Sequence, residues 1–267
     1  MKIYSSNTEL SQFLYFLSQR KQEYANRSFL HVKINKNYRQ LKIAEVVQSI
    51  TQYFQNKDAA MITFDLENDL IVTTPNNDNL AMPLFEKAIY ETFSRESVFL
   101  SDGSFNEQGI RTFSKIVLPH IPFKDWPSFI ELQRASRMAN CIMVMDDDPM
   151  VLRQMEQALV GFGTVVTVQD TDQFFDLYKK HAPDILFLDI HMPSAKGTNL
   201  LEELVTTIDP HAHVIMISSD TMKNTVLETK AKGTKGFIVK PLTRENVYAH
   251  ILRAPTFLPK QAIKSTF

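Results

Sequence analysis

The chain has 267 residues, of which 44% are hydrophobic and 22% charged, and its 29 Lys and Arg residues nearly balance 30 Asp and Glu residues. Because nucleic-acid-binding domains usually carry a clear basic excess, this balance gives no reason to expect nucleic acid as a partner. No apolar run reaches the roughly 18 residues that a membrane span needs, and the N-terminus lacks the apolar stretch of a signal peptide. We therefore expect a cytoplasmic protein without membrane contact, long enough for two domains.

The first 120 residues predict an α+β domain. After an opening helix, the hydrophobic pattern alternates between strand-like and helical segments in the order β-α-β-β-α. This order is typical of ferredoxin-like and palm-type folds. The predicted helices cover residues 8–24, 39–56 and 83–94, and the predicted strands cover 29–34, 59–66 and 69–75.

The predicted hairpin of this domain indicates whether it carries out catalysis. The hairpin reads FDLENDLIV, and the chain has no glycine before Gly103. The domain is distantly similar to the palm of nucleotide cyclases and diguanylate cyclases, where a GGDEF-type signature at this turn admits a phosphate. Since the glycines are missing, we interpret the domain as catalytically degenerate, and Asp65, Glu67 and Asp69 as parts of a solvated turn.

A proline-rich segment separates the two halves of the chain. Pro119, Pro122 and Pro127 lie within LPHIPFKDWP, a density typical of a boundary. We place the border of the N-terminal domain at residue 120 and expect residues 121–139 to form a connecting segment with a helix capped by Ser128. The single cysteine, Cys141, cannot form an internal disulfide, and its apolar neighbours predict a buried core residue.

The second half, residues 140–255 with a tail at 256–267, predicts a doubly wound α/β domain. Its strand-like runs are rich in Ile, Val, Leu and Met without alternation, as in parallel sheets that are buried on both faces. Ligands of such sheets bind at the carboxyl ends of the strands, where the winding reverses. The predicted strands are 141–145, 164–168, 184–190, 213–218 and 236–240, and the predicted helices are 149–161, 171–181, 198–208, 221–232 and 243–253.

Chemically related side chains follow these strands at their carboxyl ends. The first strand is followed by Asp146–Asp148, the third carries Asp189, the fourth ends in Ser218 and the fifth in Lys240. Carboxylates brought together repel one another, and a bound Mg²⁺ would remove that cost. A serine hydroxyl and a lysine ammonium can bind the oxygens of a phosphoryl group. The pattern therefore predicts phosphoryl transfer to the carboxylate of Asp189.

Four segments in this half resemble the receiver domains of two-component response regulators. They are IMVMDDDPMVL, DILFLDIHMPSAKG, VIMISS and GFIVKPL, and they occur in the order found in that family. The separations also fit, with 42 residues from Asp147 to Asp189, 29 from there to Ser218 and 22 more to Lys240. The resemblance covers roughly residues 140–253 and implies a flavodoxin-like (βα)₅ fold.

The resemblance implies a role for each matching residue. Asp189 would be the phosphoacceptor, Lys240 would pair with the phosphoryl group, and Ser218 and Phe237 would form the switch pair. A sensor histidine kinase or a phosphotransfer protein would supply the phosphoryl group. The implied Mg²⁺ ligands are the side chains of Asp146, Asp147 and Asp189 and the backbone carbonyl of His191.

Two other interpretations of the acidic turn have to be weighed. Asp148 precedes Pro149 and is better interpreted as a helix cap than as a ligand. The three consecutive aspartates also fit the Asp-x-Asp motif of haloacid-dehalogenase-like phosphatases, in which Asp146 would be the nucleophile. That family usually has Thr or Val where this chain has Met150, and it would leave Asp189 without a role.

The regulated output is expected to be a protein contact rather than catalysis. The chain ends 14 residues after the last predicted helix, so we expect no C-terminal DNA-binding domain. Phosphorylation would repack the face formed by the fourth and fifth helices of the receiver and alter binding to a downstream protein or a second copy of the chain. The alternative is that the receiver controls a nucleotide-related enzyme in the N-terminal domain.

Overall fold

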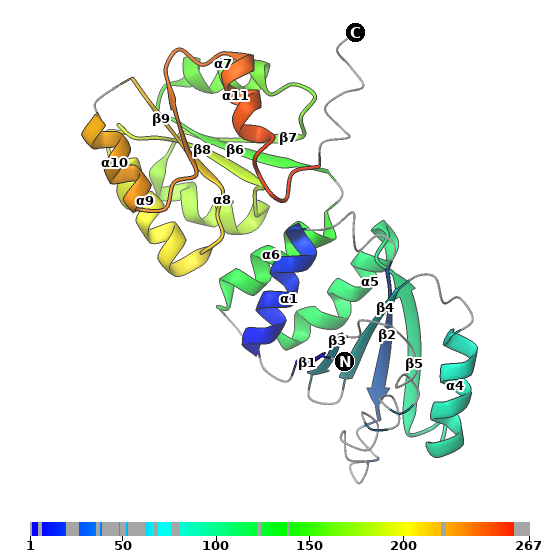
Figure 1. Ribbon diagram of the computed structural model, residues 1–267. Helices are drawn as coiled ribbons and strands as arrows, with labels where there is room; N and C mark the ends of the chain where they lie inside the picture. Colours follow the sequence, from blue (N-terminus) through cyan, green and yellow to red (C-terminus); the bar gives the residue numbers. More distant parts are fainter. Residues whose placement is uncertain are drawn as a thin grey trace. The chain divides into compact units, whose positions relative to one another are not determined.

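The computed structural model divides the chain into two compact units, residues 1–123 and 124–267 (Figure 1). Each unit has its own sheet of five strands. The structure describes residues 2–4, 7–19, 27–35, 38, 48, 52, 62–66, 69–75, 81–121, 124–137, 139–219 and 223–258. Within these ranges, no helix is both long enough and apolar enough to cross a membrane.

The sheet of the first unit has the strand order β1-β3-β4-β2-β5. Strands β2 to β5 alternate in direction in the order β3-β4-β2-β5, which is the strand order of ferredoxin-like folds and agrees with the predicted α+β class. The elements are β1 Lys2–Tyr4, α1 Asn7–Gln19, β2 Arg27–Ile34, β3 Ile62–Leu66, β4 Asp69–Pro75, α4 Ala81–Thr92, β5 Val98–Ser104, α5 Glu107–Val117 and the 3₁₀ turn Leu118–His120.

The sequence pattern missed strands β1 and β5 and helix α5 of this unit, and several of its predictions lie outside the described residues. Strand β1 has three residues, too few for a periodic pattern, and it pairs in parallel with β3 at the edge of the sheet. The predicted helix over 39–56 lies outside the described residues except at positions 48 and 52, and so do residues 20–24 of the first helix and the hairpin turn Glu67–Asn68.

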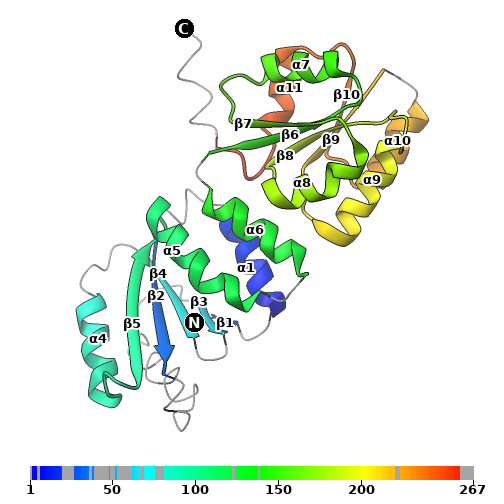
Figure 2. The same ribbon diagram turned by 180° about the vertical axis from the view of Figure 1, so that it is seen from behind.

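Four phenylalanines form an aromatic cluster in the core of the first unit. Phe13 of α1 and Phe113 of α5 meet with ring centroids 5.9 Å apart, and Phe29 of β2 packs on the same cluster together with Phe105. These contacts place α1 and α5 on one face of the sheet, as Figures 1 and 2 show. A Cβ atom at Gly103 of β5 would lie 2.7 Å from Cζ of Phe29, so a glycine is needed beneath that ring.

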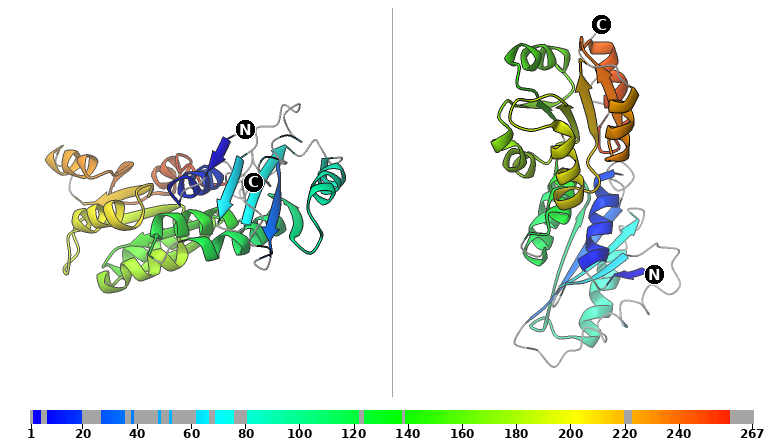
Figure 3. Two further views of the ribbon diagram at one scale, coloured as in Figure 1. Left: turned by 90° about the horizontal axis from the view of Figure 1, so that it is seen from below. Right: turned by 90° about the vertical axis from the view of Figure 1, so that its left-hand side faces the viewer.

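The second unit is a parallel sheet in the order β10-β9-β8-β6-β7, which confirms the predicted doubly wound fold. Figures 1 to 3 show the sheet between two layers of helices. The elements are α6 Trp126–Ser136, β6 Cys141–Met145, α7 Pro149–Ala158, β7 Thr164–Val168, the 3₁₀ turn η3 Thr171–Gln173, α8 Phe174–His181, β8 Ile185–Asp189, α9 Gly197–Glu203, the π-helical turn η4 Leu204–Ile208, β9 Val214–Ser218, α10 Lys223–Ala231, β10 Gly236–Val239 and α11 Arg244–Ile251.

Alternate residues of the buried strands build two hydrophobic cores in this unit. One core joins the sheet to α8, α9 and η4, and it includes Met143, Leu186 and Met216. The other joins the opposite face to α7 and α11, and it includes Val144 and Phe187. Every residue of β6, β8 and β9 is buried, which is why their sequences do not alternate.

Helix α6 lies within the second unit, although the sequence pattern placed it in a connecting segment at 121–139. Ile130 is completely buried in the first of the two cores, and Trp126 packs against that core. The helix also begins earlier than expected, because Asp125 rather than Ser128 is its cap: the carboxylate of Asp125 accepts from both the backbone N–H and the hydroxyl of Ser128. The predicted cap at Ser128 is therefore wrong.

The side chain of His213, immediately before β9, predicts how the stability of this unit depends on pH. Burial and the nearby charges of Lys235, His250 and Arg134 lower the pKa of His213 to about 4. The unfolded chain therefore binds more protons than the folded one between about pH 4 and pH 6.5, and stability falls as the pH is lowered through this window. We expect His213→Gln to reduce the loss of stability between pH 7 and pH 4 by on the order of 2 kcal/mol.

Urea denaturation of the full chain at a series of pH values measures this effect. His191→Gln, a change of an exposed histidine in the same unit, is the matched control. Equal acid sensitivity of the His213→Gln variant and the unmodified chain would contradict the prediction.

Candidate functional site

Two buried aspartates meet at the carboxyl ends of the neighbouring strands β6 and β8. Asp189 is the last residue of β8, and Asp146 follows directly after β6. The strands pair in parallel with Met145 opposite Leu188, so the two carboxylates emerge at the same edge of the sheet. This edge lies where the strand order reverses, between β6 and β8, as expected for the ligand site of a doubly wound sheet.

Lys240 joins the two carboxylates from the end of β10. Its Nζ lies 2.8 Å from Oδ2 of Asp146 and 2.9 Å from Oδ1 of Asp189. The backbone N–H of Lys240 donates to the carbonyl of Ser218 at 2.8 Å, which fixes the lysine to the end of the adjacent strand. The peptide bond that follows, to Pro241, is cis. The sequence prediction that these groups gather at one site thus agrees with the geometry for Asp146, Asp189 and Lys240.

Burial and charge oppose one another in this cluster. Burial raises the pKa of Asp146, although the hydrogen bond and charge of Lys240 partly counteract it. Burial lowers the pKa of Lys240, but its contacts with Asp146 and Asp189 outweigh burial and raise it overall. With the lysine protonated and both carboxylates ionised, the cluster has one negative charge in excess, which favours binding of a further cation.

In each of the two aspartates, the carboxylate oxygen that does not contact Lys240 accepts a hydrogen bond from a nearby backbone N–H. Oδ1 of Asp146 accepts from the backbone N–H of Asp148 at 3.0 Å, and Oδ2 of Asp189 accepts from that of His191 at 2.7 Å. Asp148 itself caps α7 by accepting from the N–H of Met150, so its interpretation as a cap is confirmed. The side chain of His191 is exposed.

The carboxylate oxygens of Asp146 and Asp189 are ligands of the kind that a hard dication such as Mg²⁺ prefers. Asp147 follows Asp146 in the chain and is half-buried, and its backbone carbonyl accepts from Nε2 of Gln169. Within the ranges that the structure describes, no three His, Cys, Asp or Glu side chains converge as a ready-made metal cluster. The structure therefore assembles two of the expected side-chain ligands and places Asp147 beside them in the chain.

Gly197 is required by the site, and its role could not be assigned from the sequence. It opens α9, and its N–H donates to the carbonyl of Ile190. A Cβ atom at this position would lie 2.0 Å from the backbone oxygen of Asp189, which no rotamer can relieve because both groups belong to the main chain. A side chain here would displace the end of β8 that carries Asp189.

Ser218 and Phe237 lie on β9 and β10, the two strands on the side of β8 away from β6. Ser218 is the fully buried last residue of β9, and it pairs with Val239 of β10. Phe237 is half-buried, pairs with Met216 and packs against the core that also holds α8 and α9. Ser218 thus ends the strand between those that lead to Asp189 and Lys240.

A hydroxyl pair across two loops escaped the sequence analysis altogether. Oγ1 of Thr171, after β7, lies 2.7 Å from Oγ of Ser194, five residues beyond Asp189. The contact ties the loop after β8 to the 3₁₀ turn η3 that follows β7. Ser194 lies in the segment DILFLDIHMPSAKG, but Thr171 is 23 residues earlier and outside the four matching segments, so the sequence offered no signal for the pair.

Comparisons with known proteins agree with this geometry. The family model for the response regulator receiver domain matches residues 142–252. The chemotaxis protein CheY of Bacillus subtilis is 34% identical over 112 residues, covering 41% of this chain and 92% of that protein. Protein CcdB of the same organism is 32% identical over 114 residues, covering 42% of this chain and 94% of its own length.

Among solved structures, the CheX-CheY-BeF3-Mg complex of Borrelia burgdorferi is 32% identical, with a TM-score of 0.40, and the match covers 42% of this chain and 87% of that one. The family model aligns with the second unit, in which Asp146, Asp189 and Lys240 meet. Through this unit, the chain belongs to the response regulator receiver family of two-component signalling.

Proposed function

We propose that the second unit accepts a phosphoryl group on Asp189 and acts as a response regulator whose output is a change in protein contacts. The observation that carries this proposal is the contact of Lys240 Nζ with both Asp189 and Asp146 at the carboxyl ends of their strands. Membership of the receiver family supports phosphoryl acceptance in general. The residue roles and the partners are what the proposal adds.

The proposed reaction transfers a phosphoryl group from a phosphohistidine of a sensor kinase or a phosphotransfer protein. A carboxylate oxygen of Asp189 attacks phosphorus, the P–N bond breaks, and the donor histidine keeps the electron pair and takes up a proton. The ammonium of Lys240 offsets the negative charge of the new acyl phosphate, and the hydroxyl of Ser218 donates a hydrogen bond to one of its oxygens. The reaction of the family is thus assigned to residues that contact one another, as Asp189 and Lys240 do, or that end a neighbouring strand, as Ser218 does.

A Mg²⁺ ion would be held by the carboxylates of Asp146, Asp147 and Asp189 together with the backbone carbonyl of His191. When bound, the ion would neutralise part of the charge on the phosphoryl oxygens. The CheX-CheY complex of Borrelia burgdorferi contains Mg and BeF3, and we propose a site of the same kind here. The excess negative charge of the Asp146–Asp189–Lys240 cluster supports it independently.

Labelling with acetyl phosphate tests the assignment of the phosphoacceptor. We expect peptide mass spectrometry of the full chain, after incubation with acetyl phosphate and Mg²⁺, to find the phosphoryl group on Asp189, and Asp189→Asn to abolish labelling. Asp148→Asn removes a carboxylate that caps α7 without reaching Lys240, so this control should be labelled normally. A phosphoryl group found on Asp146 instead would favour the phosphatase mechanism and contradict the proposal.

The proposed output surface is the face of α10, β10 and α11. Its exposed apolar side chains include Leu227, which is 64% exposed, and Val239, which is 38% exposed. Such side chains suit a downstream protein or a second copy of this chain. We expect Ser218 and Phe237 to link this face to Asp189, so that a phosphoryl mimic changes the amide exchange of α10 and α11 in the experiment described below.

The first unit is proposed to serve regulation rather than catalysis. Gly103, the first glycine of the chain, lies in β5 beneath the ring of Phe29 and so does not belong to a phosphate-binding loop. The ferredoxin-like strand order alone favours no particular activity, since such folds host many. The alternative of a nucleotide-related enzyme predicts cyclic products from nucleoside triphosphates, and their detection would overturn the proposal.

A further inference from the structure

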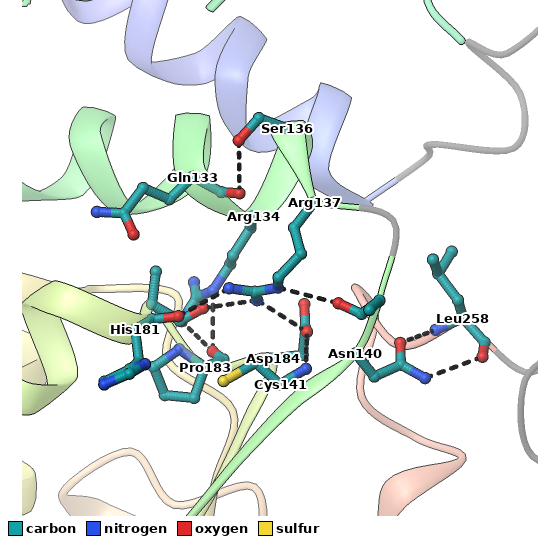
Figure 4. A network of polar contacts seen from close by, with 12 residues as sticks. Gln133, Arg134, Ser136, Arg137, Asn140, Cys141, His181, Pro183, Asp184 and Leu258 are labelled. Carbon is teal, nitrogen blue, oxygen red and sulfur yellow. Dashed lines mark hydrogen bonds and ion pairs between the residues drawn. The ribbon is translucent and has the colours of Figure 1, made fainter. Parts of the chain in front are cut away.

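Two arginines fasten helix α6 and the segment after it to the base of the second unit (Figure 4). Arg134 lies in the last turn of α6, and Arg137 is its C-terminal cap residue. Their partners lie at the amino ends of the strands, at the edge of the sheet opposite to Asp189. A catalytic role at Asp189 therefore does not explain why these charged groups are buried here.

Arg137 binds the start of the phosphoacceptor strand. Its Nη2 donates to Oδ2 of Asp184 at 2.9 Å and to the carbonyl of Ala182 at 2.8 Å, and its Nη1 donates to the carbonyl of His181 at 2.7 Å. The same oxygen of Asp184 accepts from the N–H of Cys141, the first residue of β6, at 2.8 Å. One carboxylate oxygen therefore joins Arg137 to the beginnings of both β6 and β8, the strands that lead to Asp146 and Asp189.

Arg134 is held in a buried polar socket. Its Nε and Nη2 donate to the carbonyl of Pro183 at 3.0 and 2.8 Å, and Nη2 also contacts Oδ2 of Asp209 and the hydroxyl of Tyr178. The Tyr178 hydroxyl donates to the same Asp209 oxygen at 2.6 Å. Burial lowers the pKa of Arg134, but its contacts with Asp209, Tyr178 and Glu131 together outweigh burial and raise the pKa well above its usual value, so the arginine stays protonated.

The π-helical turn η4 brings Asp209 into this socket. The N–H of Asp209 donates to the carbonyl of Leu204, five residues earlier, instead of continuing the four-residue spacing of α9. The extra residue in the turn directs the carboxylate towards α6 and α8. Three elements that flank the phosphoacceptor strand therefore converge on a single guanidinium from α6.

We propose that α6 is a relay that conveys the phosphorylation state of Asp189 to the upstream unit, an inference that rests on the proposed function. Buried, tightly packed groups transmit displacement because they have no free volume into which to relax. A shift of β8 relative to β6, or of α8 relative to η4, changes the geometry at Asp184 or Asp209, and α6 follows because both arginines are bound there. The upstream unit is covalently joined to the beginning of α6.

Hydrogen exchange of the full chain with and without beryllofluoride and Mg²⁺ tests the relay. We expect the mimic to change the exchange of α6 amides, and of amides in residues 1–121, by roughly twofold or more. In Arg137→Met, the change at α10 and α11 should persist while the changes in α6 and the first unit disappear. Arg153→Met, the same change at an exposed arginine of α7, should behave like the unmodified chain.

A second variant keeps the test decisive if Arg137→Met does not fold. Arg134→Met combined with Asp209→Leu and Glu131→Gln removes the buried charge of Arg134 together with those of both carboxylates that contact it, so no charge of this cluster loses its partner. A response at α10 and α11 without a response at α6 would overturn the relay alone. Persistence of the α6 response in either variant would overturn it as well. No response to the mimic anywhere would instead count against the proposed function, and the relay would fall with it.

Discussion

Replacing Lys240 by glutamine is expected to slow phosphorylation of Asp189 by roughly 100-fold, the usual cost of removing one fixed group that stabilises developing negative charge. The ammonium lies within 2.9 Å of both buried carboxylates, so its loss also removes the contact that counteracts the burial of Asp146. The pKa of Asp146 should then rise further. The rate of acyl phosphate formation from acetyl phosphate, followed by intact-protein mass spectrometry, measures the effect.

The opposite end of the same strand provides the control for this prediction. Lys235 is exposed and precedes β10, whereas Lys240 follows it. Lys235→Gln makes the same change in net charge far from the carboxyl edge of the sheet, so it should leave the rate within about twofold of the unmodified chain. Equal rates for the two glutamine variants would show that Lys240 has no specific part in the reaction.

Replacing Arg134 by methionine is expected to lower the free energy of unfolding of the second unit by about 3–5 kcal/mol. The guanidinium is 2% exposed, and its removal leaves the buried carboxylate of Asp209 without its cationic partner. Burial alone would raise the pKa of Asp209, and the contacts with Arg134 are the main reason why it is lowered. Combining the change with Asp209→Leu and Glu131→Gln should recover much of the loss, because both buried carboxylates that contact Arg134 are then absent.

The only tryptophan of the chain makes this measurement specific to the second unit. Trp126 begins α6, and the ammonium of Lys179 lies 4.8 Å from the centre of its ring. Urea denaturation followed by tryptophan fluorescence therefore reports on the helix that Arg134 anchors. Arg153→Met should shift stability by no more than about 0.5 kcal/mol, as expected for an exposed site. A similar small shift for Arg134→Met would show that the socket contributes little.

The sheet of the second unit could be predicted from the sequence because its strands are uninterrupted apolar runs. Each predicted strand, from Cys141–Met145 to Gly236–Val239, is found within a residue or two of its expected bounds. Carboxyl ends of parallel strands share an edge, so Asp189 and Lys240 could be expected to meet although 51 residues separate them. Periodicity and topology together were sufficient for this part of the site.

The socket around Arg134 could not be predicted, because its partners share no local pattern. Tyr178 and Asp209 lie 44 and 75 residues further along the chain. The position of Asp209 depends on a π-helical turn, which has no reliable sequence signature. The cap of α6 was misassigned for a related reason: Asp125 and Ser128 both favour helix starts, and only the hydrogen bonds distinguish them.

Two hydrogen bonds near the end of the described residues indicate where a label can be attached to the protein. The side chain of Asn140 donates to the carbonyl of Leu258 at 3.1 Å and accepts from its N–H at 2.7 Å (Figure 4). Asn140 directly precedes β6, so the backbone at Leu258 is pinned at the amino edge of the sheet. A fluorophore or affinity tag attached beyond this residue would leave from the pole remote from Asp189, where it does not obstruct an approaching phosphodonor.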